Sequence, residues 1–299
     1  MHQHHEHHHH SHSHSHTDAR IGWAFALNAG FTIIEFIGGM LTNSTAIMAD
    51  AVHDLGDCLS IGLAWILSVL SKKESDPVFT YGYRRFSLMG ALINSLVLIV
   101  GSLWVLSEAL PKLLHPQMPS AGGMLGLAIL GVAVNGYAAY KLSHGKTLNE
   151  QVLNWHLLED VLGWVAVLIV SITLLFVDWP ILDPALSIIF TLFILFNVVK
   201  SLWSTIRLFL QAAPDNELAE TLKESLLAFE DVRDVHHLRL WSLDGEHHVL
   251  TAHLVLGYSI DVPRQITLKA KIAEQLADYD LAHTTIEFEF ADEQCRDRV

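Results

Sequence analysis

The sequence predicts an α-helical membrane protein with six transmembrane helices, followed by a small α+β domain in the cytoplasm. Three observations support this fold class. The 299 residues are 51% hydrophobic and 17% charged, whereas soluble domains carry about 25% charged residues. Residues 21–210 consist of long apolar runs. The last segment, 212–299, instead carries 18 Asp and Glu against 8 Lys and Arg, which is typical of an acidic soluble domain.

Six apolar runs are long enough to cross a bilayer, because a membrane helix needs about 20 mostly apolar residues. They cover residues 21–41, 45–70, 87–109, 122–141, 152–177 and 181–208. Polar residues or helix breakers separate them, and the connection at 111–119 begins and ends with proline. We therefore expect a histidine-rich cytosolic tail over residues 1–19, a membrane domain over 20–210 and a cytoplasmic domain over 211–299.

Positive residues gather in the connections on one side of these runs. The opposite side holds only Lys112, and the positive side holds Lys72, Lys73, Arg84, Arg85 and Lys146. An excess of Lys and Arg marks cytoplasmic loops, so we expect both termini in the cytoplasm. The compact length and short loops favour the inner membrane of a prokaryotic cell, and an organelle membrane is the alternative.

Two His-x-x-x-Asp pairs lie inside apolar runs: His53 with Asp57, and His156 with Asp160. A charged side chain at mid-membrane depth costs at least about 2.5–3.5 kcal/mol, so these residues should face the protein interior. Residues four apart share one helix face. If the second and fifth runs pack together, two imidazoles and two carboxylates converge. Such a set suits tetrahedral Zn²⁺, and it binds protons once the metal has left.

An alternative interpretation is that each pair makes an ordinary polar contact between helices, or relays protons without metal. The repeated spacing in two separate runs favours the metal site. Asp50 shares the face of Asp57 and is a candidate for an ion entry path. Asp183 is either a pathway residue or the N-terminal cap of the sixth run. Other polar residues inside the runs, among them Glu35, fit a polar-lined cavity.

Four segments resemble the cation diffusion facilitator family, and specifically its zinc-transporting branch. They read MADAVHDLGD (48–57), FTYGYRRFSLMGAL (79–92), NWHLLEDVLGWVAV (154–167) and VHHLRLWSLDGEHHVLTAHL (235–254). The resemblance implies a homodimer of six-span protomers that exports divalent cations in exchange for protons.

The same resemblance implies a transport site made of His53, Asp57, His156 and Asp160. Members with two histidines and two aspartates at these positions look like zinc carriers that often tolerate cadmium, whereas members with aspartate in place of the first histidine are less restricted to zinc. Some bacterial relatives bind a second zinc ion through histidines between the second and third spans. Here that connection reads SKKESDPVFTYGYRR and contains no histidine, so we expect no metal there, and Asp76 is at most a remnant of such a site.

The C-terminal segment predicts a small αββαβ unit. Helices are expected over 217–229 and 263–278, and strands over 232–242, 247–256 and 284–290. Asp244-Gly245 is a hairpin turn signal between the first two strands. The resemblance implies that this unit is a ferredoxin-like domain that binds metal and forms the dimer.

Strand alternation predicts which polar residues of this unit share a face. His253 in the second strand and Glu287 in the third are the candidate ligands of a regulatory Zn²⁺. In the first strand, strict alternation directs His237 outward, whereas the family motif implies His236, so both stay candidates. Cys295 is a further candidate ligand. The alternative is a solvated acidic face, and Glu289 and His283 fit either interpretation.

The cysteines, the acidic surface and the N-terminal histidines limit which partners are possible. Two cysteines give no disulfide framework, and an acidic surface favours cations over nucleic acid. We expect zinc, protons and the lipid bilayer as partners, with no organic cofactor. Residues 1–16 hold ten of the twenty histidines, which indicates a disordered metal collector or, alternatively, an expression tag.

Two other classes of function compete with a proton-coupled zinc exporter. An intramembrane zinc enzyme needs an open coordination position beside three protein ligands, whereas four ligands close the sphere. A membrane metal sensor or binding protein would hold the ion without moving it. Polar residues along several runs argue against a sensor, and proton-dependent flux distinguishes it from a transporter.

Overall fold

The computed structural model describes residues 14–71, 73, 75–142 and 148–297. Within these ranges the side chains of residues 14–25 and 148–157, and of a few other helical positions, are not described. The chain forms two compact units, one from Met1–Trp65 with Ile93–Ser201 and the other from Ile66–Leu92 with Leu202–Val299.

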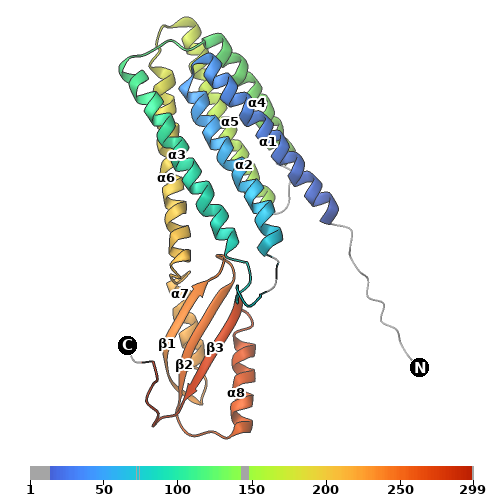
Figure 1. The fold of residues 1–299 in the computed structure, drawn as a ribbon, viewed down its shortest axis with the longest axis vertical. Coiled ribbons are helices and arrows are strands. Elements are labelled where there is room, and N and C mark those ends of the chain that lie inside the picture. The colour runs from blue at the N-terminus through green and yellow to red at the C-terminus, as the bar shows by residue number, and fades with distance from the viewer. Residues whose placement is uncertain (1–13, 72, 74, 143–147, 298–299) are drawn as a thin grey trace, which may run out of the picture. The chain divides into compact units, whose positions relative to one another are not determined.

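In the described part of the chain, six long helices run side by side over the N-terminal two thirds (Figure 1). They are α1 (His14–Thr42), α2 (Thr45–Ser71), α3 (Phe86–Leu114), α4 (Ala121–Leu142), α5 (Leu148–Phe176) and α6 (Leu182–Phe209). Among the described residues, four segments are long and apolar enough to cross a membrane: Phe86–Leu114, Ala121–Tyr140, Leu158–Phe176 and Leu182–Phe209.

The end of α3 differs from the prediction, which ended this helix at residue 109. The helix continues through Pro111 to Leu114. Proline removes a single backbone hydrogen bond, and Pro111 still accepts one from the His115 N–H at 2.8 Å. In the last turn of a long helix this single loss does not end the helix.

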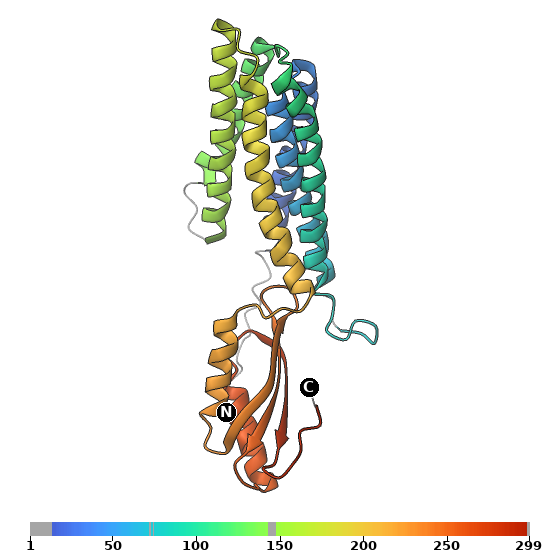
Figure 2. The same ribbon diagram turned by 90° about the vertical axis from the view of Figure 1, so that its left-hand side faces the viewer.

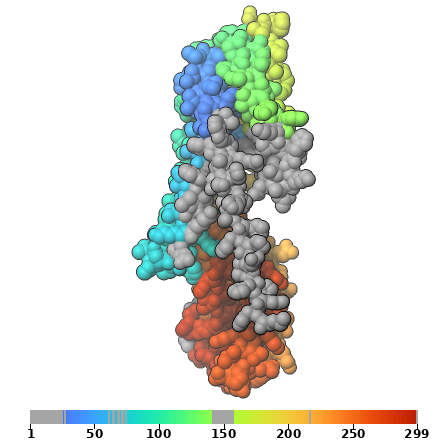
Figure 3. Space-filling view, turned by 90° about the vertical axis from the view of Figure 1, so that its right-hand side faces the viewer, coloured from blue at the N-terminus to red at the C-terminus, as the bar shows by residue number. Residues whose placement is uncertain are grey.

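Small residues let the helices approach closely. Gly131 of α4 lies against the indole of Trp164 in α5, where a Cβ atom would overlap the ring. Trp164 is 1% exposed and packs on Phe31 of α1, with ring centroids 5.7 Å apart. In the space-filling view α4, in green, lies beside α1, in blue (Figure 3). Outward-facing residues of α1 such as Ile33 and Met40 are exposed, as expected for contact with lipid.

The C-terminal unit contains α7 (Asn216–Leu227), β1 (Val232–Ser242), β2 (His248–Leu256), α8 (Val262–Gln275) and β3 (Leu281–Glu289). This is the predicted order of elements. β1 pairs antiparallel with β2, and β3 pairs parallel with β2 on its other side. Gly245, with φ 103°, makes the left-handed turn between β1 and β2, a conformation that glycine adopts without strain.

Both helices of this unit lie on one face of the sheet, and the segment after β3 lies on the other (Figure 2). The helix-covered face forms a hydrophobic core in which Leu222 of α7 and Leu268 of α8 pack with Leu250 and Leu254 of β2. The opposite face therefore carries the alternate residues of each strand, including His253.

A β-bulge interrupts β1 at His237. The pairing runs from His236 opposite His253 to Arg239 opposite Thr251, so β1 has one more residue than β2 over this interval. His237 adopts a left-handed conformation with φ 49°, which histidine tolerates better than most residues. Strict alternation in β1, as the sequence predicts it, is therefore wrong at this position. Val235 and Leu238 both contact the core, and His236 and His237 lie between them.

Candidate metal centres

The first candidate centre lies between α2 and α5. His53 Nε2 is 3.7 Å from Asp57 Oδ2 and 3.7 Å from Asp160 Oδ1. One ligand atom from each of these three residues lies within 4.8 Å of the others. His53 and Asp57 project from the same face of α2 because they are one helical turn apart. The structure thus brings together three residues that the sequence analysis selected from two distant segments.

The geometry of this centre matches a small dication. A tetrahedral zinc site with bonds of about 2.0–2.1 Å separates its ligand atoms by roughly 3.3 Å. The two distances of 3.7 Å from His53 would contract by only a few tenths of an ångström. His156 lies in α5 one turn before Asp160, but its side chain is outside the described residues, so the fourth ligand stays a prediction.

Further carboxyl groups lie near this centre on α1 and α2. Asp50 and Asp54 are 8% and 4% exposed, and Glu35 of α1 is 0% exposed. From the sequence, Asp50 is a predicted pathway residue and Glu35 is one of several polar residues inside the apolar runs. The periodicity of α1 could have indicated its importance, because Glu35 shares the inward face of that helix with Phe31 and Thr42.

Asp183, the second pathway candidate, joins two helices. One carboxylate oxygen accepts hydrogen bonds from Ser44 Oγ at 2.5 Å and Ala46 N at 3.3 Å. The other accepts from Thr45 N at 2.7 Å and Thr45 Oγ1 at 2.9 Å. Asp183 belongs to the first turn of α6, yet it caps the N-terminus of α2. A negative charge at a helix N-terminus is favourable because it opposes the helix dipole.

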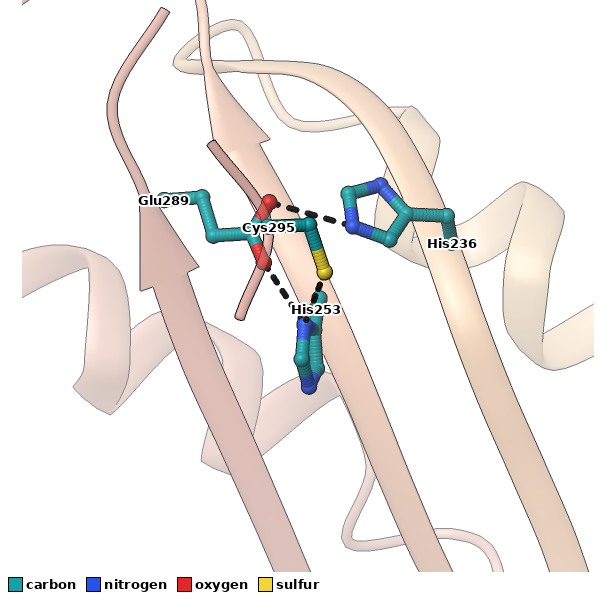
Figure 4. Close-up of side chains that lie close together, drawn as sticks. All are labelled: His236, His253, Glu289 and Cys295. Carbon is teal, nitrogen blue, oxygen red and sulfur yellow. Dashed lines mark hydrogen bonds and ion pairs between the residues drawn. The ribbon is translucent and has the colours of Figure 1, made fainter. Parts of the chain in front are cut away.

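The second candidate centre lies on the open face of the sheet (Figure 4). His253 of β2 approaches Glu289 of β3 with an Nδ1–Oε1 distance of 2.7 Å. His236 Nε2 of β1 is 3.1 Å from the other oxygen of Glu289. Cys295 Sγ, on the segment after β3, is 3.5 Å from His253 Nδ1. These four residues offer ligand atoms within 4.8 Å of one another, a nitrogen, oxygen and sulfur set that suits Zn²⁺.

Glu289 occupies the position that the sequence analysis favoured for Glu287. The Glu287 carboxylate is 3.8 Å from His253 Nε2 and forms a 2.7 Å ion pair with Arg296. Glu289 is 4% exposed and lies between His236 and His253. Alternation assigns both glutamates to one face but does not reveal which one reaches the histidines. The parallel register pairs Glu287 with His253 and Glu289 with Val255, yet the side chain of Glu289 makes the short contacts with both histidines.

The bulge brings a third imidazole to this face. The His237 ring centroid is 5.1 Å from that of His236 and 5.2 Å from that of His253. The sequence left His236 and His237 as alternatives, and the structure brings both to the open face.

The protonation of this cluster follows from its contacts. Burial favours a higher pKa for Glu289, but hydrogen bonds from Cys295 and His253 outweigh it and lower the pKa below the usual 4.5. Burial and the neighbouring Glu289 raise the pKa of the Cys295 thiol above 9.0. The carboxylate is therefore charged at neutral pH, whereas the thiol must release a proton when it binds a metal.

Asp76, in the connection between α2 and α3, has a structural role in its own loop. It accepts hydrogen bonds from Val78 N at 2.9 Å, Phe79 N at 2.7 Å and the Tyr83 hydroxyl at 2.7 Å. The Phe79 N–H and the Tyr83 hydroxyl lower the pKa of Asp76. Its oxygens fix the turn that precedes α3.

Comparison with known protein families matches both parts of the chain. Residues 23–210 match the cation efflux transmembrane domain. Residues 214–290 match the cytoplasmic domain of cation efflux proteins.

Several bacterial proteins are similar over most of their length. The cadmium, cobalt and zinc/H⁺-K⁺ antiporter of Bacillus velezensis is 31% identical over 90% of this chain and 87% of that protein. The metal cation efflux system protein CzcD of Cupriavidus metallidurans is 32% identical over 90% of this chain and 85% of that protein. The zinc transporter ZitB of Escherichia coli is 30% identical over 91% of this chain and 87% of that protein.

Proposed function

The chain belongs to the cation efflux family, the cation diffusion facilitators that its motifs resemble, and we propose that it exports Zn²⁺ from the cytoplasm in exchange for protons. It is a transporter rather than an enzyme. The observation that carries the proposal is the approach of His53, Asp57 and Asp160, from α2 and α5, to distances that suit one dication. His156 completes a tetrahedral set. Cadmium, a larger ion with similar ligand preferences, is a second substrate.

The ligand types explain why metal and protons exchange. Two carboxylates compensate the charge of Zn²⁺, which lowers the cost of holding it in a low dielectric. After the metal leaves, the same carboxylates and imidazoles bind protons, because a metal ion and a proton compete for the same ligand atoms. The inward-open state binds Zn²⁺ and loses protons. The outward-open state binds protons and loses Zn²⁺.

The proposed architecture follows the sequence. All six helices α1–α6 span the inner membrane of a bacterial cell, with both termini in the cytoplasm. The transmembrane domain covers residues 20–210, after a histidine-rich tail at 1–19, and the cytoplasmic domain covers 211–299. That domain is ferredoxin-like and forms the homodimer. The positive loops and the bacterial relatives support this arrangement.

The cytoplasmic domain binds regulatory Zn²⁺ through His236, His253, Glu289 and Cys295, with His237 and Glu287 beside them. The short distances of this cluster support the proposal. Metal bound there stabilises the domain and the dimer, so the cytosolic zinc concentration adjusts the exporter.

Zinc uptake into proteoliposomes under an imposed pH gradient tests the transport function. The wild type should move zinc only when the gradient is present. Asp57→Ala with Asp160→Ala, and separately His156→Ala, should reduce flux to the level of protein-free liposomes. Asp178→Ala with Glu108→Ala, which alters two exposed carboxylates, is the matched control and should keep full flux.

The other outcomes have definite meanings. Zinc flux that ignores the pH gradient would indicate a uniporter or channel. Zinc binding without any flux would favour a membrane metal sensor. Full flux in His156→Ala would remove that residue from the transport site.

A further inference from the structure

The inward face of α1 carries one acidic residue. Phe31, Thr32 and Thr42 are nearly fully buried on this face, while Ile33 and Ile37 on the opposite side are more than half exposed. Glu35 lies in the middle of the inward face and is 0% exposed. A charged carboxylate at such a position costs several kcal/mol unless a partner compensates it.

The closest charged neighbours of Glu35 are other acids. Among the described residues, neither of its carboxyl oxygens has a hydrogen-bond partner, and Oδ2 of the buried Asp50 has none either. The charged groups that act on Glu35 are Asp54 and Asp50 of α2 and, more weakly, Asp160 of α5. All three are acids, and they are the charged groups with the largest effect on Glu35.

A carboxyl group in these surroundings requires a proton. An ionised carboxylate only accepts hydrogen bonds, so two facing carboxylates can bond to each other only when one of them is protonated. Like charges this close in a low dielectric also repel strongly. A dication at the nearby centre instead favours the ionised form of the surrounding carboxyl groups, because its positive charge attracts theirs.

We propose that Glu35, which faces Asp54, is a proton-binding site separate from the zinc ligands, protonated while the centre is empty and ionised while Zn²⁺ is bound. This inference rests on the proposed function. When zinc enters, the O–H bond of Glu35 breaks and the proton passes to water on the cytosolic side. When zinc leaves on the other side, Glu35 takes a proton from there. Glu35 thus carries one proton of the exchange without touching the metal.

The test counts the protons released when zinc binds to the purified full-length protein. Calorimetry in buffers of different ionisation enthalpy gives this number for the wild type, Glu35→Gln and Glu35→Asp. Glu35→Gln should bind zinc and release about one proton fewer per ion, since its amide cannot ionise. Glu35→Asp, which keeps the carboxyl group, should release as many as the wild type. Glu108→Gln alters an exposed carboxylate on α3. It is the control and should release as many protons as the wild type.

Equal proton release in Glu35→Gln and the wild type would overturn the proposal. If Glu35→Gln does not fold, infrared difference spectra of the wild type decide the question. Zinc binding should remove the carbonyl band of a protonated carboxylic acid, and its persistence would also overturn the proposal. The proposed function fails separately, if Asp57→Ala with Asp160→Ala retains proton-driven zinc flux.

Discussion

Asp231 links β1 to the start of α8 through a compact charged network. It is 7% exposed and accepts hydrogen bonds from the Tyr258 hydroxyl, from Arg264 Nη2 at 3.0 Å and from Arg264 Nε at 3.2 Å. The Tyr258 hydroxyl and then the Arg264 guanidinium lower the pKa of Asp231 below 3.8. A carboxyl group with a lowered folded-state pKa stabilises the fold above its unfolded pKa, and this contribution disappears as the pH falls through the folded value.

Asp231→Asn should therefore destabilise the cytoplasmic domain at pH 7 and not in strong acid. We expect a loss of about 1 kcal/mol at pH 7, modest because water screens the half-exposed Arg264. Well below pH 3.8 the wild type loses the same charge, so the two proteins should converge. Urea unfolding of the full chain, followed by pulse proteolysis at each pH, measures this difference. Asp234→Asn, at an exposed acid of β1, is the control. A difference that persists unchanged in acid would contradict the argument.

Single residues also mark the limit of the sequence analysis. His53, Asp57 and Asp160 could be selected because an ionisable residue inside an apolar run requires a partner. Glu289 could not be distinguished from Glu287, since both lie on the same face of β3 and the strand register places Glu287 opposite His253. The side chains decide: Glu287 pairs with Arg296, and Glu289 contacts His236 and His253. The preference for Glu287 was an inference from spacing alone.

At the scale of elements, the helices and strands were largely predictable because each has a clear periodicity. The boundaries agree with the prediction within a few residues, apart from the α1 start at His14, the α3 end at Leu114 and the early start of β3 at Leu281. The parallel pairing of β3 with β2 was not predicted, because no local pattern in the sequence specifies the partner of an edge strand. The bulge in β1 was likewise missed, although the histidine pair 236–237 was the place where alternation and family motif disagreed.

The contact between α6 and the N-terminus of α2 gives an element-level prediction. Asp183→Ala leaves buried backbone and hydroxyl donors of Ser44, Thr45 and Ala46 without an acceptor. We expect the unfolding free energy to fall by about 2 kcal/mol or more, and Asp183→Asn to lose less because its amide oxygen still accepts. Thermal unfolding of the detergent-purified protein measures both. Asp178→Ala, an exposed acid just before α6, should have no effect, and an equally stable Asp183→Ala would show that the cap is dispensable.

At the scale of the whole molecule, the two metal centres belong to separate compact units of the chain. They share no ligand, so substitutions at one should not alter zinc binding at the other. His253→Ala should lower the zinc bound per chain by one equivalent while proton-driven transport persists. Asp57→Ala with Asp160→Ala should also remove one equivalent and abolish transport, and the combined variant should lose two.

Equilibrium dialysis with metal analysis measures these losses as differences between variants, so metal held by the N-terminal histidines cancels. His283→Ala, an exposed histidine of β3 outside the cluster, is the control and should keep all bound zinc. Loss of both equivalents from a single set of substitutions would mean that the centres are coupled.

The bulge in β1 has a consequence for insertions and deletions. Removing one residue from a strand normally moves every following side chain to the other face of the sheet. In β1 the residues before the bulge end with Val235 on the core side, and those after it begin with Leu238 on the core side. Deleting His237 alone would restore regular alternation from Val235 to Ser242 and leave Val235 and Leu238 on their present faces; the other irregularity of the strand, between Val232 and Asp234, would remain. From Val235 onward the strand therefore contains the framework of the cytoplasmic cluster plus one inserted histidine, and a chain that lacks His237 should keep its core side chains in place.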